Sequence, residues 1–170
     1  AYQGRVYSVD FDMNGTRILS SGKDIGPKEG YTRLWQITFG GAKIPAKPLT
    51  LIKEFPKGQD KILWASFSFD NQKIASVGRD WLVHLYSLKN AQLRHHLVGH
   101  ENSVLRAIFS PDNHQLATVS GDATVRFWDL INFSELFTLH LPSPTDEVAR
   151  LWDFDFRCTS QQNCWIAVPL

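Results

Sequence analysis

The sequence predicts an all-β protein in which short strands form a series of four-stranded antiparallel sheets. Three observations support this prediction: similar segments recur about every forty residues, apolar and polar residues alternate with a period of two inside them, and turn-forming residues separate the alternating runs. Hydrophobic residues make up 43% of the 170-residue chain and aromatic residues 12%, so intrinsic disorder is excluded and a sizeable core is expected.

The repeat is clearest in the segment that starts at Gly99-His100, passes through Phe109-Ser110-Pro111-Asp112 and ends at Trp128-Asp129. The copy before it aligns at a constant interval, because Phe67 lies 42 residues before Phe109 and Tyr86 lies 42 residues before Trp128. Two independent positions with the same spacing indicate one repeated unit rather than a chance likeness.

Two further copies are less regular. The first, from Phe11 to Trp35, requires two insertions, one at 25–30 and one in the Gly-, Pro- and Lys-rich stretch 39–48, which we expect to be a long exposed loop. A shortened fourth copy supplies two strands, at Trp152–Phe156 and at Cys164–Val168.

Within each copy the side chains alternate as they do in a strand. Val125 and Phe127 are expected on one face, and Arg126 and Trp128 on the other. Four strands in each of three copies and two in the last give fourteen strands, and no segment makes a convincing helix. The predicted units span about 4–56, 60–98 and 99–141, with a half unit at about 147–170.

Repeats of about 40–45 residues with four strands each are typical of propeller blades. Gly99-His100, Phe109-Ser110-Pro111-Asp112 and the closing Trp128-Asp129 resemble the WD40-repeat (WD-repeat) β-propeller family. The other copies depart from the pattern, since 57–60 replaces Gly-His and Tyr86-Ser87 replaces Trp-Asp. The resemblance implies a WD40 β-propeller with about three and a half four-stranded antiparallel blades, part of a ring that most often has seven.

Three and a half blades do not close a ring, and an open arc leaves apolar sheet edges without a neighbour. We expect the chain to be part of a larger WD40 protein whose other blades lie outside this sequence. The alternatives are completion by another chain that carries blades or by self-association, and a short propeller with one trimmed blade.

His100, Ser120 and Asp122 have the composition of a hydrolase triad, with Ser120 as nucleophile and His100 as its base. No strained Gly-x-Ser-x-Gly turn exposes the serine, and no oxyanion hole is recognisable. The family resemblance implies instead a structural hydrogen-bonded tetrad of Asp122, His100, Ser120 and the Trp128 indole. Such a tetrad satisfies an indole, a hydroxyl and an imidazole together when a blade buries them.

Partners of this family commonly dock on the rim formed by the turns between second and third strands. Carried over by position, this predicts contacts at the residue before each turn aspartate and at a tryptophan after one of them: Lys23, Arg79, Gly121 and Trp81. Arg and Trp are enriched in interface hot spots, so Arg79 with Trp81 is the preferred contact pair. The alternative is that Trp81 packs under a neighbouring loop and Arg79 is solvated.

Composition limits the remaining functions. With 18 basic and 17 acidic residues, the net charge of +1 argues against a protein that coats nucleic acid by charge. No apolar run approaches the ~20 residues of a membrane helix, and Ala1–Arg5 lacks an export pattern. His95 and His96 are adjacent in a strand and point to opposite faces, so they cannot share a metal ion.

The two cysteines, Cys158 and Cys164, have no zinc-ligand pair before them at usable spacing. They are either a disulfide across a hairpin or two thiols, and the thiols of a reducing compartment are favoured. We therefore expect an intracellular protein, cytoplasmic or nuclear.

Together these patterns predict a non-catalytic WD40 scaffold that binds a protein or peptide through a propeller rim, without catalytic residue, cofactor or metal. The alternative is a regulatory or sensor WD40 segment of a larger multidomain signalling protein or enzyme. Neither nucleic acid nor a membrane is an expected partner.

Overall fold

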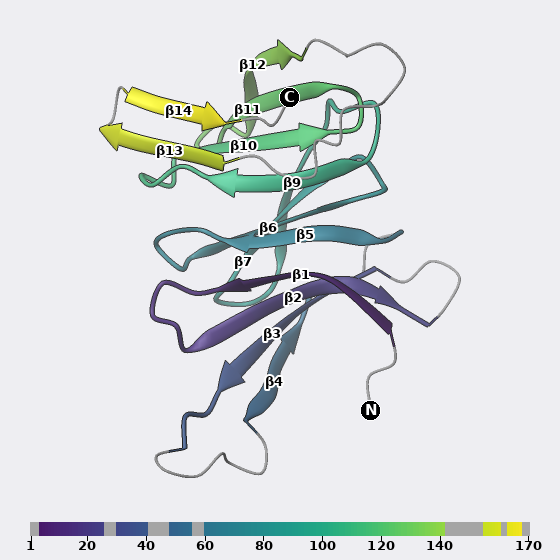
Figure 1. The fold of residues 1–170 in the computed structure, drawn as a ribbon, viewed down its shortest axis with the longest axis vertical. Coiled ribbons are helices and arrows are strands. Elements are labelled where there is room, and N and C mark those ends of the chain that lie inside the picture. Colours follow the sequence, from purple (N-terminus) through teal and green to yellow (C-terminus); the bar gives the residue numbers. More distant parts are fainter. Residues whose placement is uncertain are drawn as a thin grey trace.

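The computed structural model describes residues 4–25, 30–40, 48–55, 60–141, 155–160 and 163–167, and every regular element in these ranges is a β-strand (Figure 1). The described strands, β1 to β14, form three four-stranded antiparallel sheets and one two-stranded sheet. The predicted all-β architecture, with four strands in each of three units and two in the last, is confirmed.

Each sheet consists of consecutive strands in chain order. The first sheet contains β1 (Gly4–Phe11), β2 (Arg17–Asp24), β3 (Gly30–Ile37) and β4 (Leu49–Glu54). The second contains β5 (Ile62–Phe67), β6 (Lys73–Gly78), β7 (Val83–Ser87) and β8 (Leu93–Leu97). The third contains β9 (Val104–Phe109), β10 (Gln115–Ser120), β11 (Thr124–Asp129) and β12 (Ser134–His140).

The last sheet pairs β13 (Asp155–Ser160) with β14 (Asn163–Ala167). The first of these strands was expected to start at Trp152, which lies outside the described residues. Residues 26–29 and 41–47, which belong to the two predicted insertions, also lie outside them. Cys158 and Cys164 are directly opposite each other in this strand pair.

The three sheets follow one another along the molecule, and their first strands β1, β5 and β9 lie side by side (Figure 1). Side chains of one first strand bind the backbone of the next. Ser8 Oγ accepts a hydrogen bond from the Ala65 N–H at 3.1 Å, and Asp10 Oδ2 accepts one from the Phe67 N–H at 2.9 Å. Ser66 Oγ donates to the Ala107 carbonyl at 3.0 Å. These bonds fix the stagger of the sheets and satisfy backbone groups that the strand ladders leave unused.

The hydrophobic core lies between the sheets. One cluster joins the first and second sheets and includes Leu19, Leu34, Phe55, Phe67 and Tyr86. A second cluster joins the second and third sheets and includes Leu85, Leu97, Phe109, Leu116 and Trp128. Because each of the three four-stranded sheets is covered on a face by a neighbouring sheet, the alternation of apolar residues in these sheets follows from the stacking.

The turns repeat as closely as the strands. The turn after the first strand of each four-stranded sheet places one residue in the left-handed region, at φ of 65° for Gly15, 55° for Asn71 and 61° for Asn113. Glycine and asparagine tolerate this region best, which explains their place in the tight hairpins that the sequence predicts.

Candidate functional site

The best-defined polar site lies inside the third sheet. His100 Nδ1 is 2.9 Å from Asp122 Oδ2, and His100 Nε2 is 2.7 Å from Thr118 Oγ1. Trp128 Nε1 donates to the same Thr118 oxygen at 2.8 Å. Four side chains, from the segment before β9, from β10, from the β10–β11 turn and from β11, are thus joined in one chain of hydrogen bonds.

The direction of this chain follows from protonation. Burial lowers the pKa of His100 below its ordinary value, against the hydrogen bond and charge of Asp122, so the ring is neutral at pH 7. A carboxylate only accepts, so Nδ1 carries the hydrogen and donates to Asp122, and Nε2 accepts from the Thr118 hydroxyl. Every donor then has one acceptor, from the Trp128 indole to the Asp122 carboxylate.

Asp122 is the charged end of the chain. Burial works against its ionised form, but bonds from the Thr124 hydroxyl, the Glu101 N–H and His100 outweigh burial and lower the pKa of Asp122 to about 2. Thr124 Oγ1 donates to Asp122 Oδ1 at 2.6 Å, and the Glu101 N–H donates to Oδ2 at 2.9 Å. The carboxylate therefore ties the start of the repeat to the turn between β10 and β11.

Ser120 does not take the place that the sequence analysis gave it. Its hydroxyl donates to the Asn102 carbonyl at 3.1 Å, and Thr118 supplies the hydroxyl between His100 and Trp128. The reason is strand geometry, because Thr118 and Ser120 share a face of β10 but lie about 6.8 Å apart along the strand. Leu116 is the strand partner of Trp128, which brings the nearer residue, Thr118, within reach of the indole.

A signal for the correct hydroxyl was present in the repeat itself. Ser20, Ser76 and Thr118 occupy the same position in the three copies, and all three carry a hydroxyl. In the first sheet, Trp35 Nε1 donates to Ser20 Oγ at 2.8 Å, as Trp128 does to Thr118. The hydroxyl two residues further along is not repeated, since Gly22 and Gly78 stand at the position of Ser120.

The turn aspartate occurs in all three sheets, but its partner differs. In the first sheet Arg33 donates to both oxygens of Asp24, at 3.0 and 2.6 Å, and its Nε donates to Glu54 at 2.9 Å. In the second sheet His84 Nε2 lies 2.8 Å from Asp80 Oδ2. The His84 ring also meets His96 edge to face at 4.7 Å.

Asp24, Asp80 and Asp122 lie where the second strand of each four-stranded sheet leads into the third, and we call these three connections the aspartate rim. Two backbone bonds repeat there, from the Arg79 N–H to the Lys61 carbonyl at 3.0 Å and from the Gly121 N–H to the Ser103 carbonyl at 2.9 Å. The side chain of Arg79 is exposed, whereas Lys23 and Gly121 are half-buried.

Trp81 stands out on the aspartate rim. Its side chain is 50% exposed, and its φ of 67° is in the left-handed region. The same turn position in the third sheet is Ala123, with a φ of 62°, so the turn geometry belongs to the fold and the bulky ring belongs to this copy alone. A large residue rarely adopts this backbone conformation, which costs roughly 1–2 kcal/mol.

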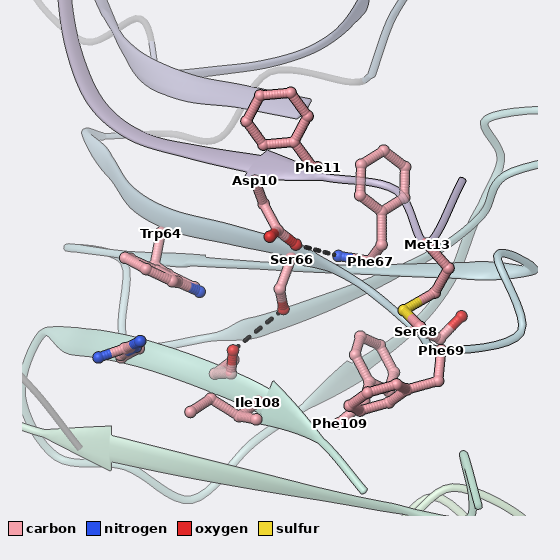
Figure 2. A pocket seen from close by; sticks show the side chains of 12 residues that line it. Asp10, Phe11, Met13, Trp64, Ser66, Phe67, Ser68, Phe69, Ile108 and Phe109 are labelled. Atoms are coloured by element: carbon pink, nitrogen blue, oxygen red, sulfur yellow. Dashed lines mark hydrogen bonds between the residues drawn. The ribbon is translucent and has the colours of Figure 1, made fainter. Parts of the chain in front are cut away.

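A pocket that sequence reasoning missed lies across β1, β5 and β9 (Figure 2). It has a volume of about 230 Å³, and the Asp10 carboxylate and the Ser66 hydroxyl make the hydrogen bonds between sheets on its wall. Burial raises the pKa of Asp10, against the Phe67 and Phe11 N–H groups and the charge of Arg106. The guanidinium of Arg106 lies 4.4 Å from the centre of the Trp64 ring.

The mouth of this pocket is apolar because the side chains of Phe11, Met13 and Phe69 are exposed there. Phe11 aligns with Phe67 and Phe109 in the repeat, which was the available signal. Those two rings are buried by the preceding sheet, whereas Phe11 is 57% exposed, since no described sheet precedes β1.

The described part of the chain has no cluster of three or more His, Cys, Asp or Glu side chains placed to hold a metal ion. His95 and His96 lie on opposite faces of β8, one stacked on Phe133 with ring centres 3.5 Å apart and the other against His84. Among the same residues, no helix has the length and apolar character needed to cross a bilayer.

Comparison with known proteins identifies one repeat in the chain. Residues 91–129 match the family model described as WD domain, G-beta repeat. The match covers β8, the connection from β8 to the third sheet, and β9, β10 and β11. No curated protein matches the chain. Proteins with such repeats generally act as protein-interaction scaffolds and are generally non-catalytic. The chain thus carries a WD40 repeat, and its three four-stranded antiparallel sheets are consistent with WD40 blades.

Proposed function

We propose that this chain is a non-catalytic WD40 scaffold that binds a protein or peptide on its aspartate rim, with Trp81 and Arg79 as the central contacts and Lys23 and Gly121 beside them. The observation that supports it is Trp81, a half-exposed ring on a left-handed backbone. Both features cost stability, and such costs are concentrated at binding sites. Exposed Trp and Arg are also the side chains most enriched in interface hot spots.

The hydrogen-bonded chain in the third sheet supports a structural role for the residues that look like a hydrolase triad. His100 Nε2 faces the Thr118 hydroxyl, and the Ser120 hydroxyl donates to a backbone carbonyl. Among the described residues, the hydrogen bonds of the Ser120 hydroxyl go to backbone groups and not to a base, and a nucleophile without a base is weak.

The test uses Trp81→Gly, with Ala123→Gly as a matched control in the same turn of the third sheet. Glycine relieves the left-handed backbone in both, so each variant should unfold at equal or higher urea concentration than the wild type. Affinity purification with quantitative mass spectrometry should recover a set of proteins with wild type and with Ala123→Gly. Trp81→Gly should recover them at least about tenfold less, because a hot-spot residue contributes 2 kcal/mol or more.

Arg79→Ala should lose the same proteins, to a smaller extent. If Trp81→Gly and Arg79→Ala both recover what Ala123→Gly recovers, the aspartate rim is not the binding surface. If Trp81→Gly unfolds more easily than wild type, the ring contributes to the fold and the argument from strain is wrong.

The face of β1 supports a second partner, a further WD40 blade from outside residues 1–170 or from another chain. Val9 is 52% exposed, whereas Ala65 and Ala107, at the same position of the other sheets, are buried. Light scattering tests whether the other chain is a second copy of this one, because self-association would double the solution mass. A monomeric mass would instead favour a blade from outside residues 1–170 or from a different protein. A monomer that binds no apolar dye at this face would contradict both.

A further inference from the structure

A second surface, away from the aspartate rim, has the chemistry of an anion site. It is a cleft of about 240 Å³ on the outer part of the second sheet, closed on one side by the third. Its cationic side chains come from three places: Lys73 at the start of β6, Lys89 in the turn after β7, and Arg94 in β8. Of the described residues that line it, none is acidic.

Strand pairing explains why these cations converge. Lys73 is the strand partner of Ser87, which also lines the cleft. Leu93 pairs with Tyr86 and His95 pairs with Leu85, so Arg94 occupies the irregularity between two adjacent pairs of β7 and β8. A register irregularity re-aims the side chain that it carries, and here that side chain borders the cleft.

The cleft has an excess of positive charge. Lys73 Nζ lies 3.6 Å from Asp70 Oδ2, so one of the three cations is partly neutralised. Lys89 and Arg94 are exposed and add two positive charges. A phosphomonoester carries about −1.5 to −2 charge at pH 7 and matches this excess, whereas a carboxylate supplies only one negative charge.

The wall of the cleft is aromatic. Phe133, from the turn between β11 and β12, lines it and stacks on His95 with ring centres 3.5 Å apart. Its φ of 56° is left-handed, and the same turn position in the second sheet is Ala91, with a φ of 54°. As with Trp81, the fold dictates the turn conformation but not the large ring, which here gives the cleft a flat apolar side.

From the cations and the ring together we infer that this cleft binds a phosphorylated side chain of a partner protein, with the phosphate between Arg94 and Lys89 and its apolar stem against Phe133. A pocket with an apolar wall and a few convergent charges is the usual form of such a site. The inference is independent of the aspartate rim, since the two surfaces share no residue.

The probe is phenyl phosphate, which combines the dianion with an apolar ring. Titration followed by amide NMR shifts should saturate with a dissociation constant on the order of 1 mM, with the largest shifts at Ser87, Lys89, Arg94 and Phe133. Inorganic phosphate, which lacks the ring, and benzoate, which carries a single charge, should each bind at least about fivefold more weakly.

Variants separate the two parts of the site. Arg94→Ala and Lys89→Ala, both at exposed positions, should weaken phenyl phosphate about tenfold, whereas Lys53→Ala on β4 should not. Phe133→Gly should weaken phenyl phosphate but leave inorganic phosphate unchanged, and Ala91→Gly is its backbone control. Absence of saturable shifts, equal loss in Lys53→Ala, or equal affinity for benzoate and phenyl phosphate would overturn the inference.

Discussion

The first and third sheets hold the same turn aspartate by different chemistry. In the third sheet Asp122 accepts from a buried neutral imidazole, and the chain continues through Thr118 to the Trp128 indole. In the first sheet Asp24 receives two bonds from the guanidinium of Arg33, whose Nε also binds Glu54. Trp35 still binds a hydroxyl, but this pair is separate from the aspartate.

The difference shows which part of the repeat the fold requires. An acceptor at the turn and a hydroxyl under the indole occur in both sheets, while the donor to the aspartate is interchangeable. The exchange has consequences, because an imidazole changes its charge near neutral pH and a guanidinium does not. Among the described residues, one chain of bonds runs from Asp122 to the Trp128 indole, whereas the bonds of Asp24 do not include the bond of Trp35 to Ser20. Deletion of the hydroxyl should therefore damage the two sheets unequally.

The largest expected effect comes from the shared hydroxyl. Thr118→Val keeps the shape of the side chain but leaves the buried Trp128 N–H and His100 Nε2 without partners, and should lower the free energy of unfolding by about 3 kcal/mol. Ser20→Ala removes one hydrogen bond, to the Trp35 N–H of a half-buried ring, and should cost about 1 kcal/mol. Urea denaturation of both variants measures the ratio. Equal losses would mean that the third sheet is not a connected network.

The cation of the first sheet comes next. Arg33→Met leaves Asp24 and Glu54 without their shared donor, and because both carboxylates reach water in part, the loss should be about 2 kcal/mol. Arg126→Met is the matched control, since Arg126 holds the same strand position but pairs with one carboxylate among the described residues, that of Glu135, at 2.6 Å. It should cost less than about 1 kcal/mol. A larger loss in Arg126→Met would contradict the assigned role of Arg33.

Acid should act on the third sheet before the first. Because the pKa of His100 is lowered in the folded state, the unfolded chain takes up its proton first, and stability is lost as the pH falls below about 6.5. Burial and the neighbouring His84 also lower the pKa of His96, so it contributes in the same range. Asp122, with a pKa of about 2, adds a second loss as the pH falls below its ordinary value of 3.8.

Urea midpoints between pH 8 and pH 5 test this order. His100→Gln and His96→Gln should each reduce the slope of stability against pH in that range. Arg33→Met should lower stability at every pH without changing the slope. A wild-type stability that is constant between pH 8 and pH 5 would show that His100 titrates alike in both states.

How far the sequence could predict this molecule depended on whether the signal was repeated. The fixed interval between Phe67 and Phe109, together with the alternation and the turn residues, was enough to predict the four-stranded sheets, because strand alternation and turn residues are local properties. The family resemblance assigned the hydroxyl of the tetrad to Ser120, but Thr118 lies on the same face of β10 and takes that place. Aligning Ser20 and Ser76 with Thr118 would have identified the right one.

Other features left no local pattern to read. Arg33 binds Asp24 in the first sheet, whereas Arg126, at the same strand position of the third sheet, binds Glu135. Spacing alone therefore cannot predict that Arg33 pairs with Asp24. The pocket across β1, β5 and β9 and the cleft behind Phe133 form between sheets. Their geometry is set by stacking, which a repeat alignment does not describe.

The smallest expected effect concerns the turns that the two sheets share. Gly15 in the first sheet and Asn113 in the third hold the same left-handed position, with φ of 65° and 61°. A methyl group at Gly15 meets nothing within 4 Å, so Gly15→Ala tests backbone strain alone and should cost about 1 kcal/mol.

Gly15→Asn is the matched control, because asparagine already occupies this position in the second and third sheets. It should unfold within about 0.5 kcal/mol of the wild type, since asparagine tolerates the left-handed region and loses less backbone entropy than glycine. Thermal and urea unfolding of the two variants separate the cases. A loss in Gly15→Asn as large as that in Gly15→Ala would mean that the first turn obeys rules of its own and is not equivalent to the third.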